Sequence, residues 1–293
     1  MNQRTNELHM KRTPLIILIL AAAVGLAATT HDFFLVPEAF FLHKGDKLDL
    51  HLLTGDAFVK DNEIKYQQAK TDRFMLYEGS KKTDLTKVAK EGATPLISYP
   101  LSYSGQVLVE MTRSLEHGDA SRDSYAEFLT GEGLDKLAEK VKGGNQFRIK
   151  EKYTRYLKTL VSVENHDGSA YGKVLNEDYE IILKSNPYKR NYGEDMTAAI
   201  KFQGKPAKGA IVMLFIKTIS GNVYPQKLVA DADGIVSFTT TREGIYLLRS
   251  VRIEPTNDKD ADFVGWWASY TFPFSSSDEL PNSYKEFGFG NIH

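Results

Sequence analysis

The sequence predicts a mainly β protein with two β-sandwich-like domains, the second of immunoglobulin or transthyretin type. Short apolar runs, separated by Gly, Pro, Asn and Asp, recur through the chain after residue 30. The segment near residues 124–142 has helical spacing instead, and the polar stretch "NPYKRNYGED" (186–195) is typical of a linker. We therefore expect a signal peptide (1–30), a mainly β domain with a helical insertion (31–188) and a C-terminal β-sandwich with a polar tail (189–293).

The first domain opens with runs typical of strands. In "KLDLHLLTGD" the alternation places Leu48, Leu50 and Leu52 on one face of a strand and His51 on the other. "RFMLYEG" (73–79) and "QVLVEMTR" (106–113) are similar short runs with turn residues around them. These three segments predict that the domain is built mainly from strands.

The helical insertion is predicted from "SYAEFLTGEGLDKLAEKVKGG". Its apolar residues recur at helical spacing, and Gly143 and Gly144 end the pattern. The next segment, "FRIKEKYTRYLKTLVSVENHDG", is ambiguous, because its first half suits a helix and "LKTLVSVE" suits a strand. We expect a helical start that continues into a strand.

The second domain is nearly all β in pattern. We expect strands in "MTAAIKFQG", "AIVMLFIK", "VYPQKLVAD", "GIVSFTTT", "GIYLLRSVRIEP" and "FVGWWASYTFPF", divided by turns such as "GKPAKG" and "DADG". Strands at roughly ten-residue spacing predict a small antiparallel sandwich. "DADG" (231–234) lacks the later carboxylates and glutamate of a calcium loop, so we expect a turn with Gly234 at positive φ.

The composition of the chain excludes several classes of function. The formal net charge of −1 gives no basic footprint for nucleic acid. The chain has no cysteine, which excludes disulfides, a thiol nucleophile and a thiolate metal site. Because no hydrolase motif or glycine-rich phosphate loop is present, we expect a protein that is not an enzyme.

The N-terminus is typical of a secretory signal. Lys11 and Arg12 precede the apolar run "LIILILAAAVGLAA" of 14 residues, which is short for a membrane-spanning helix. Cleavage fits after Ala28 or after Thr30, where small residues occupy the preceding positions. We therefore expect a periplasmic or secreted protein.

Both cleavage positions place His31 close to a new amine. Cleavage after Thr30 makes His31 the N-terminal residue, whose amine and imidazole together can chelate one metal ion. Cleavage after Ala28 yields Thr-Thr-His, a nitrogen set suited to Cu(II) or Ni(II). The alternative is that His31 is only the polar first residue of a strand.

Asp32 and His51 complete the predicted metal site. If the strand that begins near His31 pairs with residues 47–53, His31 and His51 can converge. His43, His117 and His166 lie at a run's end or in polar loops and carry no such prediction. The metal-ligand prediction is therefore His31, His51 and Asp32.

Several stretches together resemble an exported bacterial family of unknown function that carries the label NikM-like, for nickel transport. They are "HDFFLVPEAFFLHKGDKLDLHLLTGDAF", "GEGLDKLAEK", "EKYTRYLKTLVSV", "GKPAKGAIVML", "DADGIVSF", "GIYLLRSVRIEP" and "DADFVGWWASYTF". The resemblance implies a periplasmic β-sandwich protein that acts beside a nickel, cobalt or other metal-uptake system. It also implies a His-acidic start, matched by His31 and Asp32, and a second histidine in a place where this chain has Arg252.

The first hypothesis is thus a periplasmic accessory protein that binds Ni(II), Co(II) or Cu(II) for a membrane metal transporter or outer-membrane receptor. The second is a non-metal interaction module that docks to a membrane transporter or to glycan. The third is a copper monooxygenase, which needs a second histidine near His31 and a flat aromatic surface, for which Trp266 and Trp267 are candidates.

Overall fold

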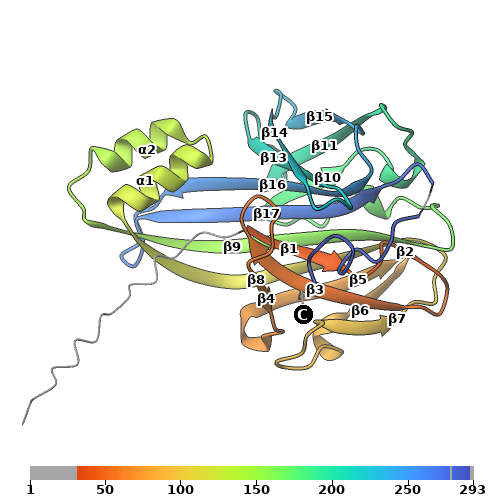
Figure 1. The fold of residues 1–293 in the computed structure, drawn as a ribbon. Coiled ribbons are helices and arrows are strands. Elements are labelled where there is room, and N and C mark those ends of the chain that lie inside the picture. The colour runs from red at the N-terminus through yellow and green to blue at the C-terminus, as the bar shows by residue number, and fades with distance from the viewer. Residues whose placement is uncertain (1–31, 278, 291–293) are drawn as a thin grey trace, which may run out of the picture.

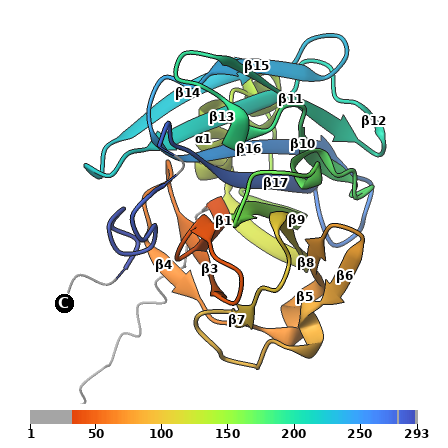
Figure 2. The same ribbon diagram turned by 90° about the vertical axis from the view of Figure 1, so that its right-hand side faces the viewer.

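In a computed structural model, residues 32–277 and 279–290 form three β-sheets stacked in layers and one pair of helices (Figure 1). A long central sheet lies between a first sheet built from the beginning of the chain and a third sheet built from the middle. Figure 2 shows these layers one above the other. The mainly β prediction is therefore confirmed.

The strands divide among the sheets as follows. The first sheet contains β1 (Asp32–Pro37), β3 (Lys47–Gly55), β4 (Asn62–Ile64) and β7 (Ile97–Pro100). The third sheet contains β10 (Tyr179–Leu183), β11 (Asp195–Phe202), β12 (Lys205–Pro206) and β15 (Ile235–Thr239). The central sheet has the order β14–β13–β16–β17–β9–β8–β5–β6, and β2 also pairs with β9. Its strands are β2 (Phe41–Leu42), β5 (Thr71–Glu78), β6 (Lys81–Asp84), β8 (Gly105–Ser121), β9 (Arg148–Val163), β13 (Ile211–Lys217), β14 (Val223–Val229), β16 (Gly244–Pro255) and β17 (Phe263–Phe274).

Alternate residues of the central strands point into two different hydrophobic cores. In β13, Phe215 packs with the first sheet, whereas Leu214 packs with the third. In β16, Leu247 and Leu248 divide in the same way. Successive side chains of a strand point to opposite faces, so one sheet serves both cores. This double burial explains why these strands are apolar along almost their whole length.

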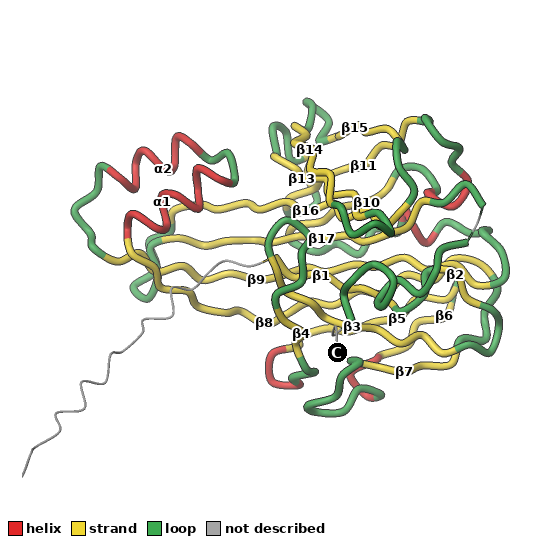
Figure 3. The backbone as a smooth tube through the Cα atoms, viewed as in Figure 1, coloured by secondary structure: helices red, strands yellow, loops and turns green. Residues whose placement is uncertain are grey.

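The helical insertion is confirmed as α1 (Arg122–Gly131) and α2 (Asp135–Lys142). The ends of β8, β9, β16 and β17 extend beyond the first and third sheets, and the two helices cover this extension (Figure 3). Leu129 and Val141 from the helices pack there against Ile253 and Trp267 from the strands. Short 3₁₀ helices occupy Gln68–Lys70, Leu85–Lys87, Ala170–Gly172 and Pro187–Lys189.

The predicted helical start in "FRIKEKYTRYLKTLVSVENHDG" is wrong, because β9 is already extended at Arg148. β9 pairs antiparallel with β8 on one side and parallel with β17 on the other. Hydrogen bonding to two neighbours outweighs the local helical pattern. The expected strands after residue 194 and the turn with Gly234 at φ 73° are confirmed.

Sheets cross the predicted domain boundary at 188/189. β10 lies before it and pairs with β11 after it, and β9 pairs with β17. The predicted polar tail also packs closely, since Phe287 and Phe289 are fully buried against the first sheet. The predicted signal peptide lies outside the described residues. Within the described residues, no helix has the length and apolar character needed to cross a membrane.

Candidate functional site

Asp32 begins β1, the first strand that the structure describes. Its side chain is only 4% exposed, and its Oδ1 atom lies 2.8 Å from Nε of Arg249 on β16. Arg249 also forms an ion pair with Glu132, which directly follows α1. Three distant segments of the sequence therefore meet at one guanidinium.

The pKa of the Asp32 carboxyl group is raised towards neutral pH. Burial raises the pKa of its carboxyl group to about 6; Arg249 opposes this rise, and the charges of Glu132 and Asp56 add to it. The carboxyl group is therefore mostly ionised at pH 7 and becomes protonated under mildly acidic conditions.

A cavity of about 810 Å³ opens beside Asp32. Its charged lining comprises four carboxylates and one guanidinium, namely Asp32, Asp56, Glu127, Glu132 and Arg249. Its apolar wall includes Tyr125, Phe128, Met213, Phe215 and Pro225. We call this cavity the acidic pocket. Carboxylates in excess over a low-dielectric wall produce a negative potential that attracts cations.

The structure does not bring His51 to Asp32. β1 and β3 pair as expected, but the register sets Val36 opposite His51 and Gly55 opposite Asp32. At roughly 3.3 Å per residue, the four positions between them correspond to about 13 Å along the strand. His31, the remaining predicted ligand, lies outside the described residues.

His51 instead belongs to a buried polar cluster. Its Nδ1 atom lies 2.6 Å from Oε1 of Glu63, and its Nε2 atom lies 3.3 Å from Oε1 of Glu38. The ring stacks on Tyr284 with centroids 3.8 Å apart. Both ring nitrogens are thus occupied by carboxylates, which explains the burial of this histidine without a metal role.

Glu63 is the centre of this His51 cluster. Burial raises its pKa, but hydrogen bonds from Thr94, Tyr284 and His51 outweigh this effect and lower the pKa to about 2. Glu63 therefore remains an anion at all physiological pH values.

Within residues 32–277 and 279–290, no three histidine, aspartate or glutamate side chains form a group that could hold a metal ion.

The two tryptophans do not form an exposed platform. Trp267 is 4% exposed and stacks on Phe128 of α1, with centroids 5.6 Å apart. Trp266 is half-buried and meets Phe202 edge-on at 4.9 Å. Arg252 forms an ion pair with Glu254.

The sequence indicates Asp32 as a site residue but does not indicate the charged residues that lie beside it. Arg249 and Glu132 come from segments far along the chain, and nothing local to Asp32 indicates them. One signal was present, since Arg249 is a charge inside the apolar run "GIYLLRSV", and a buried charge requires a partner.

Comparison with known proteins gives a family but no function. No curated protein matches the chain. A solved structure of a tetra-tandem repeat in the extending region of a large adhesion protein is 11% identical, covering 84% of this chain and 50% of that chain, with a TM-score of 0.21. The chain thus spans half the length of that structure, and the likeness adds nothing to the description of the fold. A family pattern matches residues 28–254, which is most of the chain, so the protein belongs to the family described as "Domain of unknown function (DUF4198)".

Proposed function

We propose that the protein is an exported accessory protein that binds Ni(II), Co(II) or Cu(II) and delivers the ion to a metal-uptake system in the periplasm. One observation carries the proposal. Asp32, which directly follows His31 in the sequence, lines a pocket whose charged side chains are four carboxylates and one arginine. The resemblance to NikM-like proteins supports the same class of cargo.

The division of roles follows from ligand chemistry. The amine and the imidazole of His31 supply the nitrogen ligands that Ni(II) and Cu(II) prefer. The acidic pocket beside Asp32 attracts the cation and offsets its charge. The described residues contain no complete ligand group, so the proposal depends on the amine that signal cleavage creates.

The test is calorimetric titration of the processed protein, with its N-terminus checked by mass, against Ni(II), Co(II), Cu(II) and Zn(II). We expect His31→Ala to abolish tight binding and the unprocessed precursor to bind weakly, because it has an amide in place of the amine. Glu132→Gln should weaken binding about three- to tenfold, as expected for roughly 1 kcal/mol of lost attraction. Binding should also weaken as pH falls, because both nitrogens must be deprotonated to coordinate.

His43→Ala is the matched control, because this histidine is exposed and belongs to neither the acidic pocket nor the His51 cluster. It should leave the affinity unchanged. If the processed protein and its His31→Ala variant bind every metal equally weakly, the proposal is wrong.

A further inference from the structure

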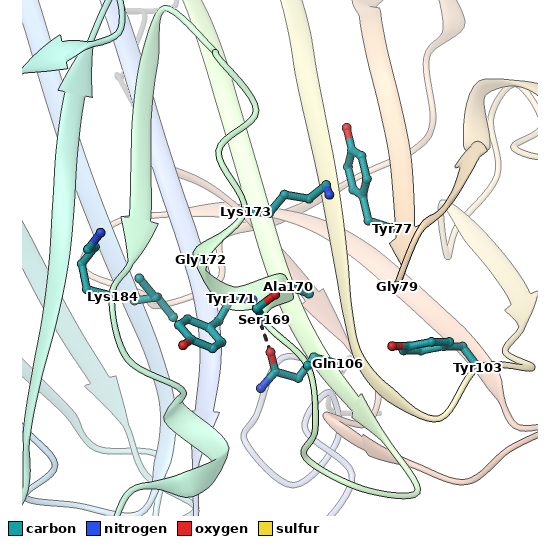
Figure 4. A pocket seen from close by; sticks show the side chains of 12 residues that line it. Tyr77, Gly79, Tyr103, Gln106, Ser169, Ala170, Tyr171, Gly172, Lys173 and Lys184 are labelled. Carbon is teal, nitrogen blue, oxygen red and sulfur yellow. Dashed lines mark hydrogen bonds between the residues drawn. The ribbon is translucent and has the colours of Figure 1, made fainter.

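A second cavity, of about 540 Å³, lies between the end of β5, the connection from β7 to β8, and residues 168–173 (Figure 4). Its side chains include three tyrosines and two lysines, namely Tyr77, Tyr103, Tyr171, Lys173 and Lys184. We call it the tyrosine–lysine cavity. Its residues are distinct from those of the acidic pocket and of the His51 cluster.

A buried glutamine holds the floor of this cavity in place. Gln106 is 1% exposed; its Oε1 atom accepts a hydrogen bond from the backbone N–H of Tyr171 (3.3 Å), and its Nε2 donates to the carbonyl of His166 (3.2 Å). The carbonyl of Tyr171 in turn accepts a hydrogen bond from the hydroxyl of Tyr270 at 3.1 Å. Both sides of the short 170–172 helix are therefore fixed, so the cavity is preformed.

The tyrosines present rings to the cavity in defined positions. The Tyr77 hydroxyl accepts a hydrogen bond from Arg73 (2.7 Å) and donates one to Glu110 (3.1 Å), so this side chain, which is only 2% exposed, is fixed as part of the cavity wall. Tyr103 packs on Gly79, where a Cβ atom would lie 2.9 Å from the ring. Figure 4 shows the Tyr103 hydroxyl directed towards Gln106.

The charge of the cavity is positive. Its lining contains two lysines and no carboxylate. Lys173 is half-buried, with Nζ 5.1 Å from the centroid of the Tyr77 ring. In the described part of the chain, neither Lys173 nor Lys184 has a carboxylate within ion-pair distance. A cationic group held over a ring without an anion is a feature that an anionic ligand would complete.

We propose that the tyrosine–lysine cavity binds a sugar acid, a pyranose ring that carries a carboxylate. The flat rings of the half-buried Tyr103 and Tyr171 suit the C–H face of a sugar ring. The Tyr103 hydroxyl and the Ser169 hydroxyl can bond to sugar hydroxyls, and Lys173 pairs with the carboxylate. The volume lies within the range of roughly 300–1,000 Å³ that is usual for small-molecule sites.

The test uses the full processed chain and ligand-observed NMR with galacturonate, galactose, inorganic phosphate and acetate, each up to about 10 mM, where even a ~1 mM Kd gives near-saturation. We expect galacturonate to bind at least about tenfold more tightly than each of the other three, since only it offers both ring and charge. Lys173→Met should weaken galacturonate binding by about tenfold. Tyr103→Leu should weaken galacturonate binding and reduce saturation transfer to the ring protons.

Lys140→Met is the matched control, because Lys140 is an exposed lysine on α2, at the far end of the molecule from the cavity. It should bind galacturonate as the unmodified protein does. The proposal is overturned if no sugar acid binds, if phosphate or acetate binds as well as galacturonate, or if Lys173→Met and Lys140→Met behave alike. His31→Ala should leave sugar binding intact, so failure of the metal proposal does not affect this result.

Discussion

At the scale of single residues, Glu151 is a buried acid whose carboxyl group occupies the space beside a glycine, where any other residue would have a side chain. It lies on β9 beneath the helices and is 3% exposed. A Cβ atom on Gly265 of the neighbouring β17 would stand 2.1 Å from its Oε1 atom. Burial raises the pKa of Glu151 to about 7, although Tyr125, Arg155 and Trp267 act to lower it. The folded protein therefore holds this proton more tightly than the unfolded chain does.

Glu151→Gln tests that conclusion. Because the pKa in the folded state exceeds the ordinary value of 4.5, the free energy of unfolding should fall as pH rises from about 4.5 to 7. The glutamine variant lacks this loss and should gain about 2 kcal/mol over the unmodified protein between pH 5 and pH 8. Urea unfolding at both pH values measures the difference. Glu139→Gln, an exposed change on α2, should show no such gain; an equal effect of both variants would contradict the prediction.

At the scale of elements, the segment 279–290 packs against the first sheet and is hydrogen-bonded to residues beside it. The backbone N–H of Ser283 donates to the carbonyl of Glu38 at 2.6 Å, and Lys60 donates to the carbonyl of Phe289, also at 2.6 Å. The Phe289 ring is fully buried, with its centroid 5.4 Å from that of Phe58. The His51 cluster adds the stacked Tyr284. The segment therefore completes the core between the first and central sheets.

Phe289→Ala should destabilise the protein by about 3 kcal/mol, because it leaves a cavity in that core. Phe147 provides a matched control in the same chain, since it is 86% exposed. Phe147→Ala should change the free energy of unfolding by no more than about 0.5 kcal/mol. Chemical denaturation of the two variants gives both values, and equal values would show that the segment does not contribute to the core.

The strands were predictable and their partners were not. A period-two pattern identified β3, and apolar runs bounded by turn residues identified β13 and β16, because both patterns are local properties of the sequence. The partner of β9 is set by apolar side chains on both of its faces, and such a run does not specify a sheet or a register. The same limit applies to the sites. Asp32 was identified from its position after His31, whereas Arg249 joins it only through long-range packing.

At the scale of the whole molecule, the central sheet connects the two halves of the chain. β9, from the first half, and β17, from the second, are paired from Phe263 to Thr271 of β17. β9 contributes side chains to both hydrophobic cores, whereas β17 contributes to the core beside the third sheet and to the cluster beneath the helices; residues from both halves of the chain make up each of the two cores. Neither half can therefore bury its apolar surface without the other, and we expect one cooperative unit rather than two independent domains.

Dissection of the chain tests this expectation. Fragments 32–188 and 189–293, prepared separately, should each lack a cooperative thermal transition, because separation breaks the β9–β17 pairing and exposes the apolar side chains that the two halves bury against each other in both cores. The intact mature chain should unfold in one step, with tryptophan fluorescence coincident with far-UV circular dichroism. Both tryptophans, Trp266 and Trp267, lie on β17, so their fluorescence reports on the shared sheet from within the second half.

If fragment 189–293 unfolds cooperatively by itself, the C-terminal sandwich is an independent domain and the boundary predicted at residue 188 is correct. If the fragments regain a joint transition only when mixed, the shared central sheet is what makes the molecule a single folding unit.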